Sequence, residues 1–306
     1  MTYFVNLRSH AVGGWLDTSA DVRVQSSPPA TPDGFNQPPV DRSQFLGDIR
    51  GRHVLIGTHG FNVDFIAGVT ALSYWSSLLA LSGPTIFVGL LWPGDSIWAH
   101  GLDYPLETSV ADEAGEKLAA FIGQSMTDAA SLSFVSHSLG ARVILQTISR
   151  MAGPIRCAVL MAGAIDDDCL STEFQNAVQS VGATSVLASK HDEVLAWAFP
   201  LGNLLGGIID RGHPWWHGAL GRYGPAKPFP GNFAAPFQIP DDWKYGHHHY
   251  LQDDPAYAGP PVGQQDVPPQ GSAYPAPMVD PATGQPLEGW QEAFSAAFVS
   301  TRFNQS

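Results

Sequence analysis

Short apolar runs alternate with amphipathic helical patterns between about residues 53 and 200 of this 306-residue chain. This alternation is typical of βαβ units, and it predicts an α/β fold with a mostly parallel central sheet and helices on both faces. A chain of this length has enough residues for a large buried core in one domain. The expected strands lie at residues 53–58, 85–92, 132–136, 157–162 and 184–189.

Helices are expected between these strands because apolar residues recur there at helical spacing. The pattern is clearest in the second helix, where Val110, Ala114, Leu118 and Phe121 share one face. Similar patterns occupy residues 65–79, 143–151 and 174–181.

The two ends of the chain depart from this alternation. Residues 3–7 and 22–25 are expected as antiparallel strands at one edge of the sheet. Residues 199–246 are rich in Gly, Pro and aromatic residues, and they are expected to form a loop-like or lid-like insertion. We therefore expect one main domain over residues 1–253, followed by a Pro-rich extension over residues 254–306 that ends in a helix.

The composition restricts the partners of the chain. Charged residues make up 14% of it, the formal net charge is −13, and no run of Lys or Arg occurs, so nucleic acids and anionic membrane surfaces are unsuitable partners. Two cysteines are too few for a disulfide framework, and Cys157 is expected in the core. The chain lacks a leader pattern and a long apolar segment, so it is expected in the cytoplasm, with no integral membrane segment.

Residues 131–142, Ser-Leu-Ser-Phe-Val-Ser-His-Ser-Leu-Gly-Ala-Arg, contain the strongest chemical motif. A short apolar run ends in Ser-x-Ser-x-Gly, and a helical pattern follows at once. A strand, a tight turn and a helix N-terminus together expose a serine hydroxyl and direct backbone N–H groups towards it. The middle serine, Ser138, is therefore the candidate nucleophile. Ser136 occupies the position where the usual Gly-x-Ser-x-Gly motif has its first glycine.

A serine nucleophile needs an oxyanion hole, a base, and an acid that orients the base. The sequence His59-Gly60-Phe61-Asn62 follows the first parallel strand, and its glycine lets the backbone approach a substrate closely. The N–H groups of Phe61 and Leu139 are the expected oxyanion donors. Strand-to-helix turns with glycine are also common without any catalytic role, so this interpretation depends on the serine motif downstream.

Asp192 is the candidate acid because it comes soon after the last expected strand. Open α/β sheets place their sites at the carboxyl ends of parallel strands, where this carboxylate could accept a histidine N–H. The competing interpretation is that Asp192 caps the helix beginning at Glu193. Glu193 itself is a neighbouring alternative, and the three aspartates at residues 166–168, after the preceding strand, are a second source of the acid.

The candidate base is one of three adjacent histidines, His247, His248 and His249, which follow all the strands. A Ser–Asp–His order along the chain places the base there, but spacing does not choose among the three. Adjacent histidines diverge in a regular backbone and rarely bind one metal ion. His213 and His217 have helical spacing, but glycine and proline interrupt that segment, so neither a metal nor a cofactor is expected.

Together these residues resemble those of an α/β-hydrolase. The resemblance rests on His59-Gly60-Phe61, the elbow at residues 136–140, Asp192 and the late histidine, and it covers about residues 50–251. Within that superfamily the chain is similar to an uncharacterised bacterial group. The elbow of that group reads small-His-Ser-(Met/Leu)-Gly, and its fourth strand ends in Trp-Pro, here Trp92-Pro93. Serine meets the need for a small residue at the first elbow position, where strand and helix cross closely.

The resemblance also bears on the base and the reaction. Many members have a tyrosine three positions after the histidine, which fits His247, whereas relatives with His-x-Tyr indicate His248. The resemblance implies a serine hydrolase of carboxylic esters that acts through an acyl-enzyme with Ser138, His247 and Asp192. Thioesterase or amidase activity needs the same residues. A non-catalytic binding module with this fold is the alternative from another class.

An apolar, glycine-rich segment follows the candidate acid and bears on the substrate. Phe199, Leu201, Trp215 and Trp216 lie in it and are expected to bind an acyl chain. The expected substrate is therefore a small-molecule ester with an apolar acyl chain of short to medium length. Packing of the same segment against one face of the sheet is the competing interpretation.

Overall fold

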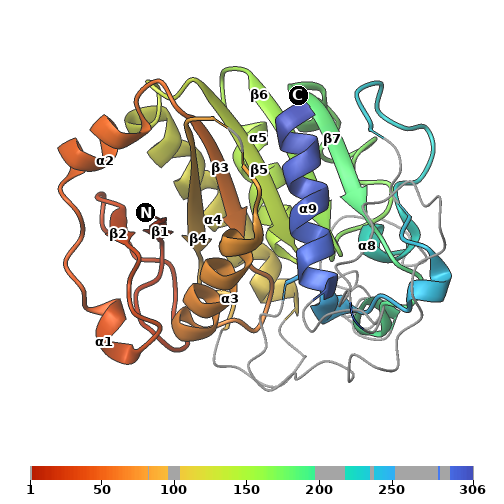
Figure 1. The fold of residues 1–306 in the computed structure, drawn as a ribbon, viewed down its shortest axis with the longest axis horizontal. Coiled ribbons are helices and arrows are strands. Elements are labelled where there is room, and N and C mark those ends of the chain that lie inside the picture. The colour runs from red at the N-terminus through yellow and green to blue at the C-terminus, as the bar shows by residue number, and fades with distance from the viewer. Residues whose placement is uncertain are drawn as a thin grey trace.

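A seven-stranded sheet forms the centre of the computed structural model, in the order β2-β1-β4-β3-β5-β6-β7 (Figure 1). The structure describes residues 2–81, 83–95, 104–196, 218–234, 238–251, 282 and 290–305, with only the backbone described at 104–107 and 305. Strand β2 pairs antiparallel with β1, and the other neighbouring pairs of this sheet are parallel. The strands are β1 (Tyr3–Asn6), β2 (Arg23–Ser26), β3 (His53–Thr58), β4 (Thr85–Leu91), β5 (Ser131–His137), β6 (Ile155–Met161) and β7 (Val181–Leu187).

The predicted α/β fold with a mostly parallel sheet is confirmed. Each of the five strands expected between residues 53 and 189 is present, with ends that differ by three residues or fewer. The expectation of two antiparallel strands at one edge holds for β2, which pairs antiparallel with β1, and is wrong for β1, which runs parallel to β4 with Tyr3 opposite Val88. The direction of a single short strand follows from its long-range partner, which a local pattern does not contain.

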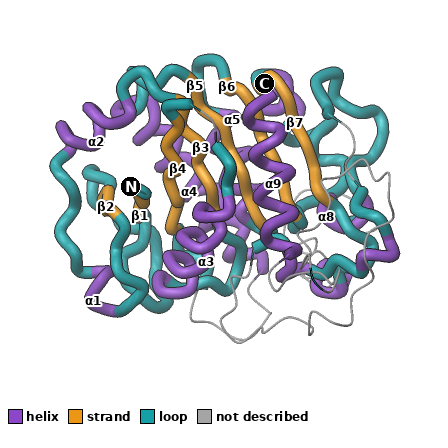
Figure 2. The backbone as a smooth tube through the Cα atoms, viewed as in Figure 1, coloured by secondary structure: helices purple, strands orange, loops and turns teal. Residues whose placement is uncertain are grey.

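Side chains of the central strands alternate between two buried layers, because successive residues of a strand point to opposite faces. In β3, Val54 and Ile56 join one cluster of buried side chains and Leu55 joins the other; in β5, Phe134 and Val135 divide in the same way. Figure 2 shows the helices that cover these two faces. They are α4 (Tyr104–Ser125) and α5 (Gly140–Ser149) on one face, and α3 (Phe65–Leu78) and α9 (Trp290–Gln305) on the other.

The helix α9 belongs to the layer that contains α3. Its side chains Trp290, Phe294 and Phe298 are buried, as their spacing predicts, while Leu287 lies outside the described residues. The indole N–H of Trp75 in α3 donates to the Ser295 hydroxyl at 2.8 Å. This helix therefore completes one face of the sheet, and the domain boundary at residue 253 stays a prediction.

Several short helices escape the periodicity of the sequence. The longest is α2 (Arg42–Ile49), which begins after Asp41, whose carboxylate accepts from the Ser43 N–H at 2.7 Å. It buries only Phe45 and Ile49, which is too few residues to define a period. The others are α1 (Pro32–Phe35), α8 (Leu220–Tyr223), and the 3-10 turns η1 (Asp241–Trp243) and η2 (His247–His249). The short helix α6 (Gln175–Gln179), in contrast, lies within the helix predicted over residues 174–181.

The segment expected as an insertion, residues 199–246, is described from residue 218 apart from 235–237. This part lies along β7, where Thr184 pairs with Phe233 and Ala188 pairs with Gln238 in isolated parallel bridges. It therefore covers the outer edge of the sheet.

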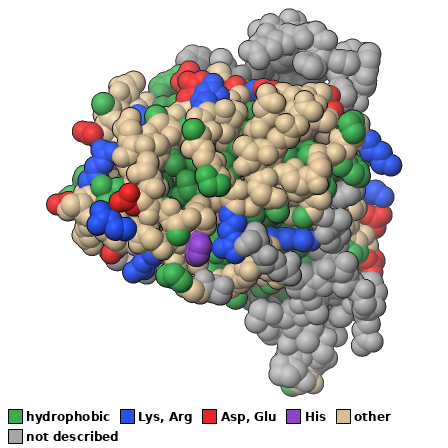
Figure 3. Space-filling view, turned by 90° about the horizontal axis from the view of Figure 1, so that it is seen from above, with side chains coloured by type: hydrophobic (Ala, Val, Ile, Leu, Met, Phe, Trp, Pro, Cys, Tyr) green, Lys and Arg blue, Asp and Glu red, His purple; other side chains and the backbone are tan. Residues whose placement is uncertain are grey.

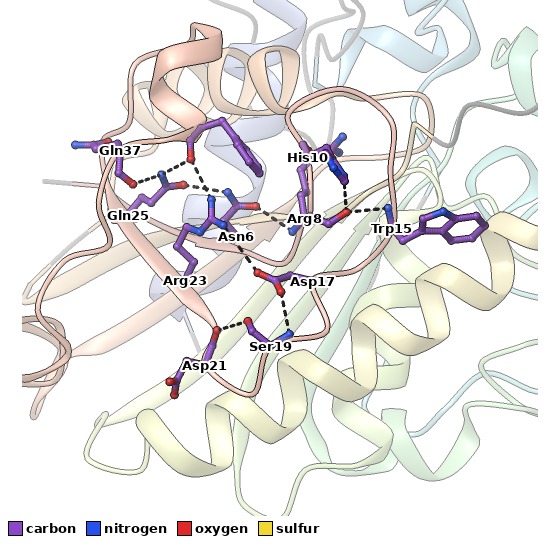
Figure 4. A network of polar contacts seen from close by, with 12 residues as sticks. Asn6, Arg8, His10, Trp15, Asp17, Ser19, Asp21, Arg23, Gln25 and Gln37 are labelled. Carbon is purple, nitrogen blue, oxygen red and sulfur yellow. Dashed lines mark hydrogen bonds and ion pairs between the residues drawn. The ribbon is translucent and has the colours of Figure 1, made fainter.

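A polar network fixes β1 and β2 at the opposite edge (Figure 4). The side-chain amide of Asn6 donates to Gln25 at 3.0 Å, and its oxygen accepts from the backbone N–H of Arg8. The amide of Gln25 donates in turn to the carbonyls of Gly34 and Gln37. Both side chains are buried, so these bonds satisfy groups that water does not reach.

The surface of the described part carries mixed charge. Figure 3, seen from above, shows the edge at which the strands begin, and there Lys and Arg side chains are interspersed with Asp and Glu. None of the described helices combines the length and the apolar character that crossing a membrane requires.

The buried carboxyl of Glu292, in the first turn of α9, makes stability depend on pH. Burial raises the pKa of Glu292 from 4.5 to about 7, so folding favours the protonated form. The resulting stabilisation is complete below pH 4.5 and is lost as the pH rises through about 7. We predict that Glu292→Gln matches the wild type at pH 4 and exceeds its free energy of unfolding at pH 8 by about 3 kcal/mol.

Urea unfolding at the two pH values measures this difference. Glu113→Gln makes the same substitution at an exposed residue of α4 and is the matched control. Equal responses of the two variants to pH would contradict the prediction.

Candidate active site

The candidate nucleophile Ser138 occupies a strained turn between β5 and α5. Its φ angle is 53°, in the left-handed region that non-glycine residues rarely adopt. The Ser138 N–H donates to the carbonyl of Met161 at the end of β6, and the Ser138 carbonyl accepts from Ala164 at 3.1 Å. Both bonds hold the strained residue in place, so the hydroxyl stands at the carboxyl end of the sheet.

The first residue of α5 lies directly against the turn that follows β3. A side-chain carbon on Gly140 would come within 2.4 Å of the His59 carbonyl oxygen and 2.8 Å of the Thr58 methyl group. Real Cβ atoms do not approach an oxygen so closely, so only glycine permits this packing. The contact brings the serine turn and the His59-Gly60-Phe61 turn together.

The structure joins Ser138, His247 and Asp192 by hydrogen bonds in series. The His247 Nδ1 atom lies 2.8 Å from Asp192 Oδ2, and His247 Nε2 lies 3.0 Å from Ser138 Oγ. A carboxylate only accepts, so Nδ1 carries the proton and Nε2 is left to accept the serine O–H. All three side chains are buried, which protects both bonds from competing water.

Asp192 uses its two carboxylate oxygens for different partners. Oδ2 faces His247, and Oδ1 accepts from the Leu195 N–H at 2.9 Å, which caps the helical residues 193–196. The Arg222 guanidinium from α8 donates to the Asp192 carbonyl at 2.5 Å. The two interpretations of Asp192 from sequence are therefore compatible, because capping fixes the carboxylate that His247 meets.

The other histidines of the triplet take different positions. His248 is half-buried, and its ring packs edge-on against that of His247 at 5.4 Å. His249 Nδ1 accepts from the Gly246 N–H at 2.9 Å. Burial, and next the neighbouring His248, lower the pKa of His249 to about 4, so its ring stays neutral. Of the three, His247 is the one placed within hydrogen-bond distance of Ser138.

The alternative acids lie elsewhere. Glu193 is exposed on the helical turn that Asp192 caps. Residues 166–168 belong to the loop after β6, where their backbone makes hydrogen bonds. Asp166 forms an isolated antiparallel β-bridge with Ala219, and the Asp168 carbonyl accepts from Ser171. The oxygen found 2.8 Å from His247 Nδ1 belongs to Asp192.

The expected oxyanion donors lie on the two turns that meet at Gly140. Neither the Phe61 N–H nor the Leu139 N–H donates to a partner within the described ranges, so both remain available to a ligand. The Trp92 indole donates to the His59 carbonyl at 3.0 Å, and the Asn62 N–H donates to the Gly94 carbonyl. The segment after β4 thus holds the turn that carries Phe61.

The buried Arg8 supports the same region and was missed by sequence reasoning. Its guanidinium donates to the carbonyls of Val63 and Trp92, and it forms an ion pair with Asp95. The position of a positively charged Arg directly after an apolar strand is the only sequence signal that Arg8 would be buried and support this region. Arg8 connects the ends of β1 and β4 to the segment that follows the His59 turn.

The loop with the three histidines is fixed to α9. The Tyr245 hydroxyl contacts the carbonyls of His249 and Gln291, and the Ser295 hydroxyl donates to the Tyr250 carbonyl at 2.7 Å. Tyr245 is fully buried against aromatic rings that include Phe294. The C-terminal helix therefore supports the segment that carries the candidate base.

Two further side chains near the elbow have structural contacts that explain their positions. Ser136 is fully buried, as the need for a small residue implies, and its hydroxyl has no hydrogen-bond partner among the described residues. Arg142 braces α5, because its guanidinium pairs with Asp112 of α4 and with Glu173. The expected substrate-binding residues and histidine pair lie outside the described residues: Phe199, Leu201, Trp215, Trp216, His213 and His217.

Comparison with known families agrees with this geometry. The profile of a family described as "Alpha/beta hydrolase of unknown function (DUF900)" matches residues 41–211, more than half of the chain. The chain belongs to this family. No curated protein sequence matches the chain. The matched part of this α/β hydrolase includes Ser138 and Asp192, whereas His247 and α9 follow it.

The close approach at Gly140 predicts opposite effects for two glycine substitutions in this α/β hydrolase. Gly140→Ala places a methyl group on the His59 carbonyl, and we expect it to lower the free energy of unfolding by about 1–3 kcal/mol. Gly123→Ala, on the exposed side of α4 with no atom within 4 Å of the new carbon, should raise it by about 0.5–1 kcal/mol. Urea unfolding measures both variants. A neutral or stabilising Gly140→Ala would show that the two turns do not touch as described.

Proposed function

We propose that this α/β hydrolase cleaves carboxylic esters through an acyl-enzyme, with Ser138 as nucleophile, His247 as base and Asp192 as the acid that orients the base. The observation that carries the proposal is the pair of hydrogen bonds in series, 2.8 Å and 3.0 Å long, between three buried side chains. A nucleophile, a base within reach of its proton, and a third group that orients the base are the three parts such catalysis needs.

The proposed mechanism follows from these contacts. Ser138 Oγ attacks the acyl carbon of the ester while His247 Nε2 takes its proton. The imidazolium that forms is stabilised by Asp192 Oδ2 at Nδ1. His247 then gives the proton to the leaving alcohol oxygen as the carbon–oxygen bond breaks. A water molecule, deprotonated by the same nitrogen, attacks the acyl-enzyme, and the carboxylic acid leaves with Ser138 protonated again.

The N–H groups of Phe61 and Leu139 are proposed to hold the negative oxygen of each tetrahedral intermediate. Their lack of partners within the described ranges supports this role, since a donor already bonded elsewhere would be of little use. Two hydrogen bonds add support, from the Trp92 indole to the His59 carbonyl and from the Asn62 N–H to the Gly94 carbonyl, because they fix the turn that carries Phe61 before substrate arrives. A donor that needs no rearrangement stabilises developing charge most effectively.

An apolar acyl chain of short to medium length is the proposed substrate group. The sequence between residues 199 and 216 supports it through Phe199, Leu201, Trp215 and Trp216. The loop after β1 adds exposed apolar side chains at the carboxyl edge of the sheet, Val12 at 64% and Trp15 at 59% exposure. Sites that bind small organic ligands are typically lined by apolar side chains with a few polar groups.

Replacement of the nucleophile tests the proposal directly. Ser138→Ala should lower kcat for p-nitrophenyl butyrate by at least about 10³-fold and abolish labelling by a fluorophosphonate, with thermal unfolding little changed. Ser171→Ala, which changes a half-buried serine that donates to the Asp168 carbonyl, is the matched control and should be labelled like the wild type. Unchanged ester hydrolysis by folded Ser138→Ala protein would refute the mechanism, and wild-type protein without labelling or turnover would indicate a binding module.

The two roles of Asp192 can be separated by substitution. Asp192→Asn keeps an oxygen that accepts from Leu195 but loses the charge opposite His247, so we expect kcat to fall about 10³–10⁴-fold with little loss of stability. Asp192→Ala should lose as much activity and, in addition, about 1–2 kcal/mol of unfolding free energy from the missing cap. Steady-state kinetics and urea unfolding measure the two effects. An active Asp192→Asn enzyme would assign the acid to another residue.

A series of p-nitrophenyl esters tests the substrate class. If the acyl chain is buried, kcat/KM should rise about three- to fourfold for each methylene added after acetate until the pocket is full. Longer chains should then show a plateau or a decline. Activity confined to charged or peptide substrates would contradict an apolar acyl site.

A further inference from the structure

His137, which directly precedes the candidate nucleophile, has a contact that the proposed mechanism does not use. Its side chain is fully buried, and its Nε2 atom lies 2.9 Å from the backbone carbonyl oxygen of His247. A carbonyl oxygen only accepts, so the nitrogen must carry a proton and donate it. His137 thus binds the backbone of His247, while the side chain of His247 reaches Ser138, the residue directly after His137.

Ring contacts reinforce this bond. The rings of His137 and His247 are 4.8 Å apart between centroids and tilted by 48°, and the ring of Tyr250 lies 6.2 Å from that of His137. His137 therefore contacts the loop at a backbone atom, at the ring of the candidate base and at a third side chain beyond it. If the buried His137 ring only needed a hydrogen-bond partner, its three contacts would not all have to lie in this loop.

The loop needs such an anchor. His247 lies in η2, a turn of three residues outside the sheet, whereas Ser138 follows β5, which pairs with a strand on each side. The His247 ring must fit between two fixed atoms, Asp192 Oδ2 and Ser138 Oγ. Displacement of a reacting group by about 1 Å lowers catalysis by about 100-fold. An anchor on β5 ties the base to the same strand that delivers the nucleophile.

We propose that His137 is a positioning residue that holds the His247 backbone, and through it the imidazole, in register with Ser138. This role rests on the proposed function, since it matters for turnover only if His247 is the base. It predicts that the donor N–H, and not the bulk of the ring alone, determines the rate.

Three variants separate the donor from the bulk. His137→Gln keeps an amide N–H close to the position of Nε2, His137→Met keeps a side chain of similar length without a donor, and His137→Asn has a donor that is too short to reach. With p-nitrophenyl butyrate we expect kcat of His137→Met and His137→Asn to fall about 10–100-fold with KM within about twofold of the wild type. His137→Gln should retain kcat within about threefold. Thermal unfolding, followed in parallel, shows which variants fold.

Two outcomes overturn the role of His137. One is a folded His137→Met or His137→Asn enzyme with wild-type kcat. The other is a kcat that falls in all three variants in step with their melting temperatures, including His137→Gln. Because His137→Asn is also polar, the test remains informative if the methionine variant does not fold. Failure of the proposed function has a different signature: wild-type protein that neither turns over the ester nor reacts with a fluorophosphonate at Ser138.

Discussion

The packing of α5 against the turn after β3 is the contact on which the rest of the site depends. After β5 ends, Ser138 adopts a left-handed conformation and α5 begins two residues later. This short connection places the start of α5 beside His59. Gly140 allows this approach because it has no side chain to collide with the His59 carbonyl. Through that one contact, the hydroxyl of Ser138 and the N–H groups of Phe61 and Leu139, which have no acceptor among the described residues, come to the same edge of the sheet.

Around this contact, several side chains serve the fold and the candidate chemistry at once. Asp192 caps a helix with one oxygen and faces His247 with the other. Trp92 fills the core and holds the His59 carbonyl. Arg8 satisfies carbonyls of segments distant in sequence and is itself neutralised by Asp95. Buried polar groups of this kind are stable only when all their partners are in place, so the geometry of the site depends on that of the core.

Local patterns in the sequence predict the parts of this structure that depend on short spacings. The five central strands follow from runs of apolar residues, and Ser138 follows from the strand, turn and helix around it. The choice of Asp192 as candidate acid and His247 as candidate base needed the order along the chain and a resemblance, because the two residues are 55 residues apart. Sequence reasoning did not find His137, Arg8 or the direction of β1. Each depends on a partner distant in the chain: His137 bonds a carbonyl 110 residues away, and β1 takes its direction from β4.

The position of α9 has a consequence for the order in which the working molecule is assembled. A ribosome releases the strands, Ser138 and Asp192 before it releases α9, because α9 follows all of them in the chain. Until then, Tyr245 lacks the Gln291 carbonyl, Tyr250 lacks the Ser295 hydroxyl, and the side of α3 that packs on α9 is uncovered. The nascent protein can therefore fold its sheet early, yet the loop with the three histidines is secured late. Premature termination before α9 would give a chain with Ser138 and Asp192 but without the helix that supports the His247 loop.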